Sequence, residues 1–486
     1  MKESLILIIL ACYFGILMFI SYLTGKKSNN RTFFIGNKQS PWMLVAFGMI
    51  GTSISGVTFV SVPGMPLSID MTYMQTVLGF AVGYLVVAHL LLPLYYKLNL
   101  TSIYTYLKER FGNRAYKTGA SFFLLSKTIG AAARLYIVVL ILQHYVFDRW
   151  QIPFVATTAG IILLIWLYSH RSGIKTIVWT DALQTFFLLG SLVLIIHTVM
   201  SDLNLDLAGV IQTIANDERS RIFVFDDWFT TQNFFKQFLS GIFITIVMSG
   251  LDQDMMQKNL SCRTLKDSQK NMYSYGIAFI PVNLLFLSLG ILLAVYAQAK
   301  GIALPALGDE MLPMFATQYL GAAVVIFFSI GIIAAAFSSA DSALTALTTS
   351  FCIDILEIEK VEEKRAEKIR KLTHIAISAL FVLIIVIIKA VNNKSIIDAI
   401  YIVASYTYGP LLGLFFFGLF TKQKANDNWI PYIAFISPII CFLLDLFTAR
   451  YTPYRFGYEL LMMNGLFTIL GLYLSSVQTP LKANRK

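Results

Sequence analysis

The sequence predicts an all-α integral membrane protein with about 13 transmembrane helices. Its composition argues against water as the main solvent, because 57% of the 486 residues are hydrophobic and only 13% are charged, whereas soluble proteins carry about a quarter charged residues. The apolar residues also form unbroken runs of about the 20 residues that a helix needs to cross a bilayer. Such runs are too long and too continuous for barrel strands, so helices remain as the fold that satisfies the backbone in lipid.

The apolar runs and their loops fill the chain, so we expect one membrane domain over residues 1–486. The first run, from Leu5 to Leu23, is too long for the apolar region of a signal peptide and lacks a small-residue cleavage pattern. We therefore expect it to be retained as a helix. The predicted spans lie near residues 3–24, 43–62, 73–96, 117–145, 153–169, 176–200, 232–256, 272–298, 319–350, 372–390, 396–420, 429–447 and 457–476.

Positive charge gathers in alternate loops, which accounts for the net charge of +11 without nucleic-acid binding. The positive-inside rule then predicts an N-terminus outside and a C-terminus in the cytoplasm, and an odd number of spans gives the same arrangement. The charge alternation within 358–371 is typical of a solvated cytoplasmic helix between two spans. The basic segments are 26–38, 97–114, 171–175, 258–270, 360–371, 422–424 and 482–486, and the acidic one is 202–227.

Cysteine and histidine patterns favour neither a metal centre nor an enzyme. The four cysteines are scattered without metal spacing, so we expect no disulfide framework and no zinc site. The five histidines also lack ligand spacing, and no Ser/His/Asp arrangement is visible. A membrane-embedded enzyme is therefore disfavoured.

Polar residues inside the spans are candidates for function, since inserting an ionisable residue at the centre of a membrane helix costs about 2.5 to 3.5 kcal/mol. The second span, Ala46 to Gly64, is rich in small and hydroxyl residues. These indicate either close helix packing or an unwound segment whose carbonyls bind a cation, and the span alone favours packing. A late span carries Ser338, Ser339, Asp341 and Ser342. Membrane serines often bond their own backbone, but a carboxylate beside three hydroxyls favours a cation site.

Two further charged residues lie within predicted spans. Asp181 is either functional or a carboxylate near the cytoplasmic interface that bonds a nearby hydroxyl, and the residue alone leaves both open. Arg134 lies near the middle of its span, two turns after Lys127. Its permanent charge needs an anionic partner, which is either a protein carboxylate such as Asp341 or a carboxylate of a bound substrate.

In this order and spacing, these segments resemble the sodium/solute symporter family over essentially the whole chain. The resemblance rests on the polar second span and on three motifs, WTDALQ (179–184), AAAFSSADSAL (334–344) and GPLLGLFFFGLF (409–420). It implies the LeuT-type fold with an extra N-terminal helix at 3–24, a five-helix repeat at 43–200, its inverted copy at 232–420 and trailing helices at 429–476. The second span would be the broken first core helix, and Gly250 would break its inverted counterpart.

The resemblance also implies an ion site. One sodium would lie between the broken second span and the late serine-rich span, bound by the carbonyls of Gly51, Ile54 and Ala335 and the hydroxyls of Ser338 and Ser339. Some relatives hold a second sodium between an aspartate that matches Asp181 and a serine pair, whose positions here are filled by Asp341 and Ser342. The carboxylate of Asp341 could strengthen this site, pair with Arg134 or take up a proton.

The solute site implied by the resemblance lies beside the broken helix. Arg134 matches a carboxylate-binding arginine of the sialic acid carriers, which favours an organic anion. The remaining expected solute contacts are Ser53, Ser55, Thr58, Thr245, Met248 and the weaker candidate Gln75.

The implied function is sodium-coupled import of a small solute by alternating access, with Na⁺ as the cofactor and the bilayer as partner. We expect it in the bacterial inner membrane. Two alternatives stay open: a symporter of a neutral solute such as a sugar, in which Arg134 forms a structural pair, and a channel or non-transporting sensor on the same scaffold. The solute, the stoichiometry and the oligomeric state do not follow from the sequence.

Overall fold

A computed structural model describes residues 2–26, 28–171, 173–391 and 396–476. Within these ranges the elements are helices, with two isolated bridges and no strand, which confirms the all-α prediction. The longer helices are α1 (Lys2–Gly25), α3 (Trp42–Ser53), α6 (Tyr73–Val86), α9 (Asn113–Leu142), α10 (Phe154–Ser169), α11 (Ile174–Asp202), α13 (Phe234–Thr245), α15 (Leu265–Lys300), α17 (Gly321–Ser350), α18 (Glu363–Val391), α19 (Ile396–Phe420), α20 (Ile430–Tyr451) and α21 (Leu460–Leu474). The shorter helices include α2 (Asn30–Ile35), α4 (Gly56–Ser61), α5 (Pro66–Ile69), α7 (Leu92–Lys97), α8 (Thr105–Arg110), α12 (Leu207–Ala215), α14 (Gln253–Leu260) and α16 (Met311–Met314).

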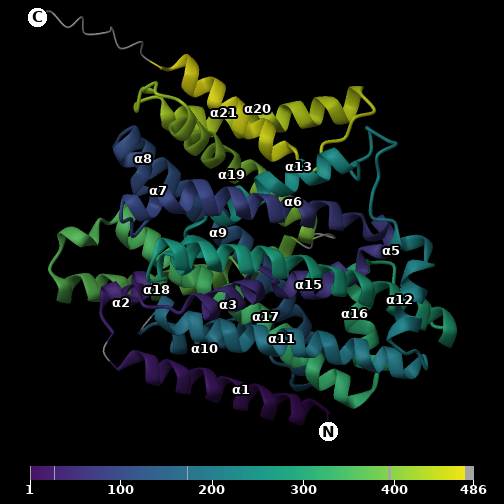
Figure 1. The fold of residues 1–486 in the computed structure, drawn as a ribbon. Coiled ribbons are helices and arrows are strands. Elements are labelled where there is room, and N and C mark those ends of the chain that lie inside the picture. Colours follow the sequence, from purple (N-terminus) through teal and green to yellow (C-terminus); the bar gives the residue numbers. More distant parts are fainter. Residues whose placement is uncertain (1, 27, 172, 392–395, 477–486) are drawn as a thin grey trace, which may run out of the picture.

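Most of the long helices run side by side, with α1 along one edge of the molecule and α20 and α21 along the opposite edge (Figure 1). Within the described ranges, seven helical segments are long and apolar enough to cross a membrane, and one bent pair raises this number to eight. Five shorter apolar helices accompany them. The count of about 13 spans therefore stays a prediction, and so do the boundaries of the two repeats.

Two helices are interrupted near the middle of the molecule. The first break separates α3 from α4 at Ile54, whose backbone leaves the helical region with φ −82° and ψ 77°. Ser55 then caps α4 by accepting a hydrogen bond from the Thr58 N–H. The second break follows Gly250, where α13 and its π-helical extension meet α14 at a bend of 64°. Both interruptions were expected from the sequence.

The first broken helix packs closely on its neighbours. A Cβ added to Gly51 would lie 2.1 Å from Thr185 Oγ1 on α11, so only glycine allows this approach. A Cβ on Gly48 would lie 2.9 Å from the Cβ of Asp181. The close packing that small residues predicted is therefore present, and it occurs together with the break in the helix.

The charged stretch 358–371 is mostly exposed and helical from Glu363 onward, but this helix, α18, continues through the next apolar run. Helical spacing of charges cannot show where such a helix ends. One expectation about a charged residue is wrong. Lys258, which we assigned to a cytoplasmic basic loop, lies in α14 with its side chain only 1% exposed.

Candidate functional site

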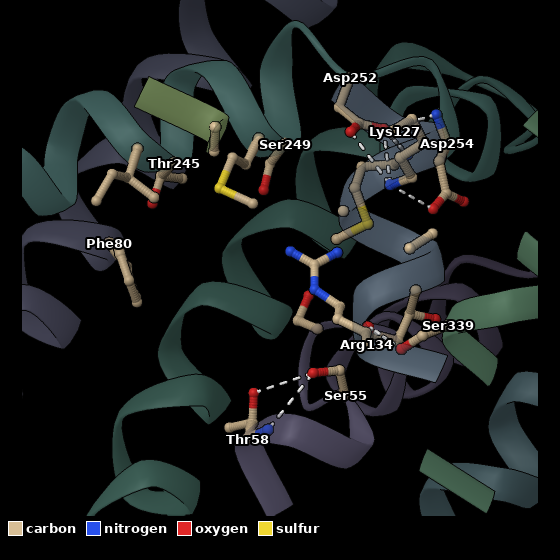
Figure 2. A pocket seen from close by; sticks show the side chains of 18 of the residues that line it. Ser55, Thr58, Phe80, Lys127, Arg134, Thr245, Ser249, Asp252, Asp254 and Ser339 are labelled. Atoms are coloured by element: carbon tan, nitrogen blue, oxygen red, sulfur yellow. Dashed lines mark hydrogen bonds and ion pairs between the residues drawn. The ribbon is translucent and has the colours of Figure 1, made fainter. Parts of the chain in front are cut away.

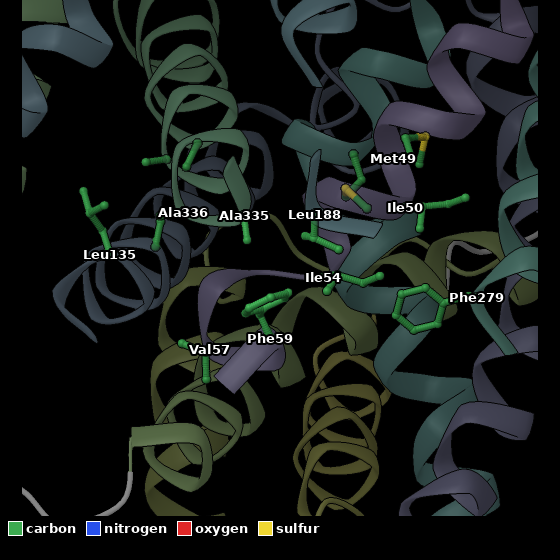
Figure 3. Packing of buried hydrophobic residues seen from close by; sticks show 14 of the residues in the cluster. Met49, Ile50, Ile54, Val57, Phe59, Leu135, Leu188, Phe279, Ala335 and Ala336 are labelled. Atoms are coloured by element: carbon green, nitrogen blue, oxygen red, sulfur yellow. The ribbon is translucent and has the colours of Figure 1, made fainter. Parts of the chain in front are cut away.

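The break between α3 and α4 faces the serine-rich part of α17. Ser339 Oγ donates to the Thr52 carbonyl at 3.2 Å, and the hydroxyls of Ser338 and Thr52 lie 3.1 Å apart. The Ile50 carbonyl accepts from the Ile54 N–H, but because α3 ends at Ser53, the carbonyls after Ile50 have no helical partner one turn further along. Ile54 and Ala335 lie in the packed region around this break (Figure 3). Backbone and hydroxyl oxygens of two elements thus meet there, as the implied sodium site requires.

Asp181 is buried inside the protein. Its side chain is 1% exposed, and its Oδ2 lies 2.6 Å from the Lys258 ammonium. The same ammonium donates to Thr52 Oγ1 at 2.5 Å, while Asp181 Oδ1 accepts a hydrogen bond from Ser338 at 2.7 Å. The buried pair therefore lies directly beside the helix break. Lys258 is a site residue that sequence analysis missed.

Asp341 does not pair with Arg134 in the structure. Its Oδ2 accepts from the Tyr168 hydroxyl at 2.8 Å and its Oδ1 from the Ser342 N–H at 2.6 Å. The Ser342 hydroxyl itself is buried and makes no hydrogen bond to any described residue. The role of Asp341 and Ser342 as ion ligands stays a prediction.

A single pocket collects most of the expected solute contacts. Its lining comes from α3, α4, α6, α9, α13, α14, α15, α17 and α19. Ser339 also lines it, so one serine faces both the pocket and the helix break. Six of the seven predicted residues line this pocket: Ser53, Ser55, Thr58, Arg134, Thr245 and Met248.

Arg134 extends into the pocket, and no hydrogen bond or ion pair joins its guanidinium to the other residues drawn in Figure 2. No hydrogen bond or ion pair joins this guanidinium to another residue of the described chain. The Thr245 hydroxyl is likewise buried without a partner among the described residues. These two side chains leave both a positive charge and a polar group free for a ligand.

Gln75 lies outside this pocket, which corrects its assignment as a solute contact. Its amide nitrogen donates to the Gln232 carbonyl at 2.9 Å, and its amide oxygen accepts from the Val224 N–H at 3.1 Å. Gln75 therefore ties α6 to the segment before α13. From the sequence, the loop between the broken helix and the span of Gln75 left the helical register of Gln75 uncertain.

Sequence analysis also did not identify Asp252 and Asp254, two acidic residues at one end of the pocket. Lys127 pairs with Asp252 at 3.1 Å and with Asp254 at 2.7 Å, as Figure 2 shows. Asp252 in addition accepts from the Tyr408 hydroxyl at 2.6 Å and caps the N-terminus of α14. Asp252 and Asp254 fall within the predicted span 232–256, but hydropathy alone does not show which polar residues of a span face a pocket.

Tyrosine hydroxyls form a second polar region of the pocket. Ser53 hydrogen-bonds the Tyr275 hydroxyl, which lies 2.5 Å from the Tyr84 hydroxyl. Phe80 and Phe279 line the pocket close to them. The pocket thus combines a free cation, several hydroxyls and aromatic faces, which suits a small polar solute.

Broken helices that meet around a polar pocket define a secondary transporter of the LeuT-type fold. The solved structure of a Na⁺-coupled sialic acid symporter, in a substrate-bound outward-open state, matches this chain with a TM-score of 0.82 at 21% identity, over 97% of this chain and 99% of that one. A structure of Mhp1, a nucleobase-cation-symport-1 family transporter, matches with a TM-score of 0.53 at 15% identity, over 92% and 94% of the two chains. These likenesses establish the fold.

The family follows from the sequence match. The model of the sodium:solute symporter family matches residues 33–428, and the chain belongs to this family. It is therefore a multi-pass membrane transporter with Na⁺ as its coupling ion. The sodium/sialic acid symporter of Proteus mirabilis is 25% identical over 441 residues, 88% of this chain and 86% of that protein. The sodium/sialic acid symporter of Aliivibrio fischeri is 24% identical over 447 residues, 89% of this chain and 86% of that protein.

Proposed function

We propose that this protein imports a small organic anion together with Na⁺ by alternating access across the plasma membrane. The observation that carries the proposal is Arg134, a permanently charged side chain that lines the pocket without a protein partner. A guanidinium can bind a carboxylate through two parallel hydrogen bonds. A half-buried positive charge in a pocket that no protein carboxylate neutralises is best explained by a negatively charged ligand.

Sodium would bind at the break between α3 and α4. Its proposed ligands are the carbonyls of Gly51, Ile54 and Ala335 and the hydroxyls of Ser338 and Ser339. Bound there, the ion would connect the broken helix to α17 and neutralise the carbonyl dipoles at the helix ends.

Ser339 belongs to both the proposed ion site and the proposed solute site. It lines the pocket and donates to the Thr52 carbonyl at the break. Sodium that fixes this contact would complete the pocket wall, so the solute would bind more tightly when sodium is present. The reverse must hold to the same extent, because the coupling free energy is reciprocal.

The solute we favour carries a carboxylate and several hydroxyls. The carboxylate would bind Arg134, and the hydroxyls would bind Ser55, Thr58 and Thr245, which lie around the same pocket. Sialic acids have this chemistry, and two relatives similar over most of the chain are named for their transport. Transport rather than catalysis is the proposed activity.

The proposed orientation places the N-terminus outside and the C-terminus in the cytoplasm. In Figure 1 the basic elements α2 and α8 lie at one end of the helix bundle, and α5 and α12 lie at the other. Helix α12 is part of the acidic segment 202–227. This segregation of charge supports the end with α2 and α8 as cytoplasmic.

The test is uptake of labelled solutes into liposomes that contain the purified protein, with and without an inward sodium gradient. The panel contains a sialic acid, a monocarboxylate, a sugar and a neutral amino acid. We expect sodium-dependent uptake of an anion, and a loss of at least about tenfold in Arg134→Gln, which corresponds to about 1.4 kcal/mol. The matched control is Arg114→Gln, which removes an exposed arginine at the start of the same helix.

A neutral solute carried equally well by wild type and Arg134→Gln would contradict the anion assignment. That result would favour the sugar-type alternative, with Arg134 in a structural role. Equal uptake with and without the sodium gradient would contradict the coupling of transport to sodium.

A further inference from the structure

Lys258 places a cation inside the core of the transporter. Its side chain is 1% exposed, as is that of its partner Asp181. The ammonium lies 2.6 Å from Asp181 Oδ2 and donates to Thr52 Oγ1 at 2.5 Å. Both contacts are made to oxygen atoms, which are also the ligands that hard metal cations take. The ammonium therefore has the surroundings of a bound monovalent ion.

The oxygens that contact this ammonium among the described residues lie on two helices, Thr52 on α3 and Asp181 on α11. Ser338 of α17 supports both of them, because it donates to Asp181 Oδ1 at 2.7 Å and its hydroxyl lies 3.1 Å from that of Thr52. A carboxylate and a hydroxyl thus hold the ammonium that Lys258 brings from α14.

We propose that Lys258 is a tethered cation that permanently fills the site made by Asp181, Thr52 and Ser338. The inference rests on the proposed sodium site at the helix break and sets its stoichiometry: the protein binds one Na⁺, at the break, and none at Asp181. A second sodium at Asp181 would have to share one carboxylate with the ammonium, and two like charges at that separation repel.

Asp341 is held by residues other than Lys258. One of its oxygens accepts a hydrogen bond from the Tyr168 hydroxyl and the other from the Ser342 N–H. Asp181 alone balances the single positive charge of Lys258, so this buried pair is neutral without a metal ion.

Equilibrium binding of radiolabelled sodium to the purified full-length protein tests the proposal without a known solute. We expect one sodium per wild-type protein. Lys258→Gln removes the ammonium but keeps the length of the side chain nearly unchanged, so it should bind two. Lys258→Arg keeps a positive charge in place and should bind one, as a matched control.

A double variant guards against misfolding of the single one. Asp181→Asn combined with Lys258→Gln removes both charges, so neither is left buried and alone. In our proposal Asp181 binds the ammonium and Ser338 but no sodium, and the amide oxygen of asparagine can still accept from Ser338. This variant should therefore still bind one sodium. A drop from the wild-type number would show that sodium uses Asp181 and would overturn the proposal.

The remaining outcomes separate this inference from the proposed function. Two sodium ions in wild type, or one in both wild type and Lys258→Gln, would overturn the tethered-cation proposal and leave sodium coupling intact. No sodium in wild type and one in Lys258→Gln would support the tethered cation but contradict sodium binding at the helix break. No sodium in either protein would contradict both.

Discussion

Individual buried charges decide what the centre of this protein can bind, because each is costly unless it has a partner. Asp181 is paired with Lys258, and Asp252 with Lys127, within the described chain. Arg134 makes no such pair there and faces the pocket. The paired charges are therefore assigned to the protein's own structure and the unpaired one to the solute.

The Asp252 carboxylate is expected to stabilise the inner end of the pocket. It accepts from Lys127 and Tyr408 and caps α14. Asp252→Asn keeps the shape but removes the charge that faces a buried ammonium, so we expect a loss of about 2 kcal/mol in stability. Thermal unfolding of the purified protein in detergent measures this.

The control for that change is Asp206→Asn. Asp206 is an exposed cap of α12 that accepts from the Gly209 N–H, and asparagine caps a helix as well as aspartate does. Its melting temperature should stay at the wild-type value. Equal shifts in both variants would mean that the burial of Asp252 contributes nothing.

At the scale of the helices, the two interruptions place the ion and solute sites. The first leaves carbonyls free between α3 and α4, and the second turns α14 into the molecule so that Lys258 and Asp252 become buried. Without the second bend, Lys258 would lie beyond the end of the predicted span 232–256. Breaks in helices thus bring polar groups to places that continuous helices would keep apolar.

Gly51 is expected to be indispensable for the contact between α3 and α11. Gly51→Ala would place a Cβ 2.1 Å from Thr185 Oγ1, and overpacking of this kind costs about 1–3 kcal/mol. We expect a lower melting temperature and weaker sodium binding. Gly190→Ala on α11 meets no atom within 4 Å, so it should be neutral or stabilising. Similar melting temperatures for the two variants would contradict this packing.

Much of the fold and part of the site could be predicted from the sequence. Apolar runs identified most helices, and small polar residues identified the first break, since both are local patterns. The cluster of Ser338 and Ser339 was found in the same way. Gln75 was placed wrongly because its side-chain direction depends on the register of a loop. Lys258 was placed wrongly because counting loop charges cannot detect a helix that folds back inward.

The whole molecule combines a polar centre with ends of opposite charge. The basic elements α2 and α8 and the acidic segment 202–227 lie at different ends of the bundle (Figure 1), which supports one orientation in the membrane. With that orientation, a transporter of this fold would take sodium and the solute from outside and release both into the cytoplasm.

Cysteine labelling in intact cells tests the orientation. In a Cys12→Ser background, Asp226→Cys should react with a membrane-impermeant maleimide from outside, because Asp226 is exposed in the acidic segment. Lys424→Cys is exposed in the segment between α19 and α20 and should react only after the cells are permeabilised. The reverse pattern would contradict the proposed orientation.

The central claim is that sodium at the helix break and an anion in the Arg134 pocket bind cooperatively. The most direct measurement is the affinity of the purified protein for the transported anion in the presence and absence of sodium. We predict that sodium tightens anion binding at least about tenfold, or about 1.4 kcal/mol, and that Ser339→Ala removes this effect. Ser329→Ala, which changes a serine of α17 that bonds the Val325 carbonyl of its own helix, should keep it. Equal anion affinity with and without sodium in wild type, or an undiminished effect in Ser339→Ala, would contradict the account.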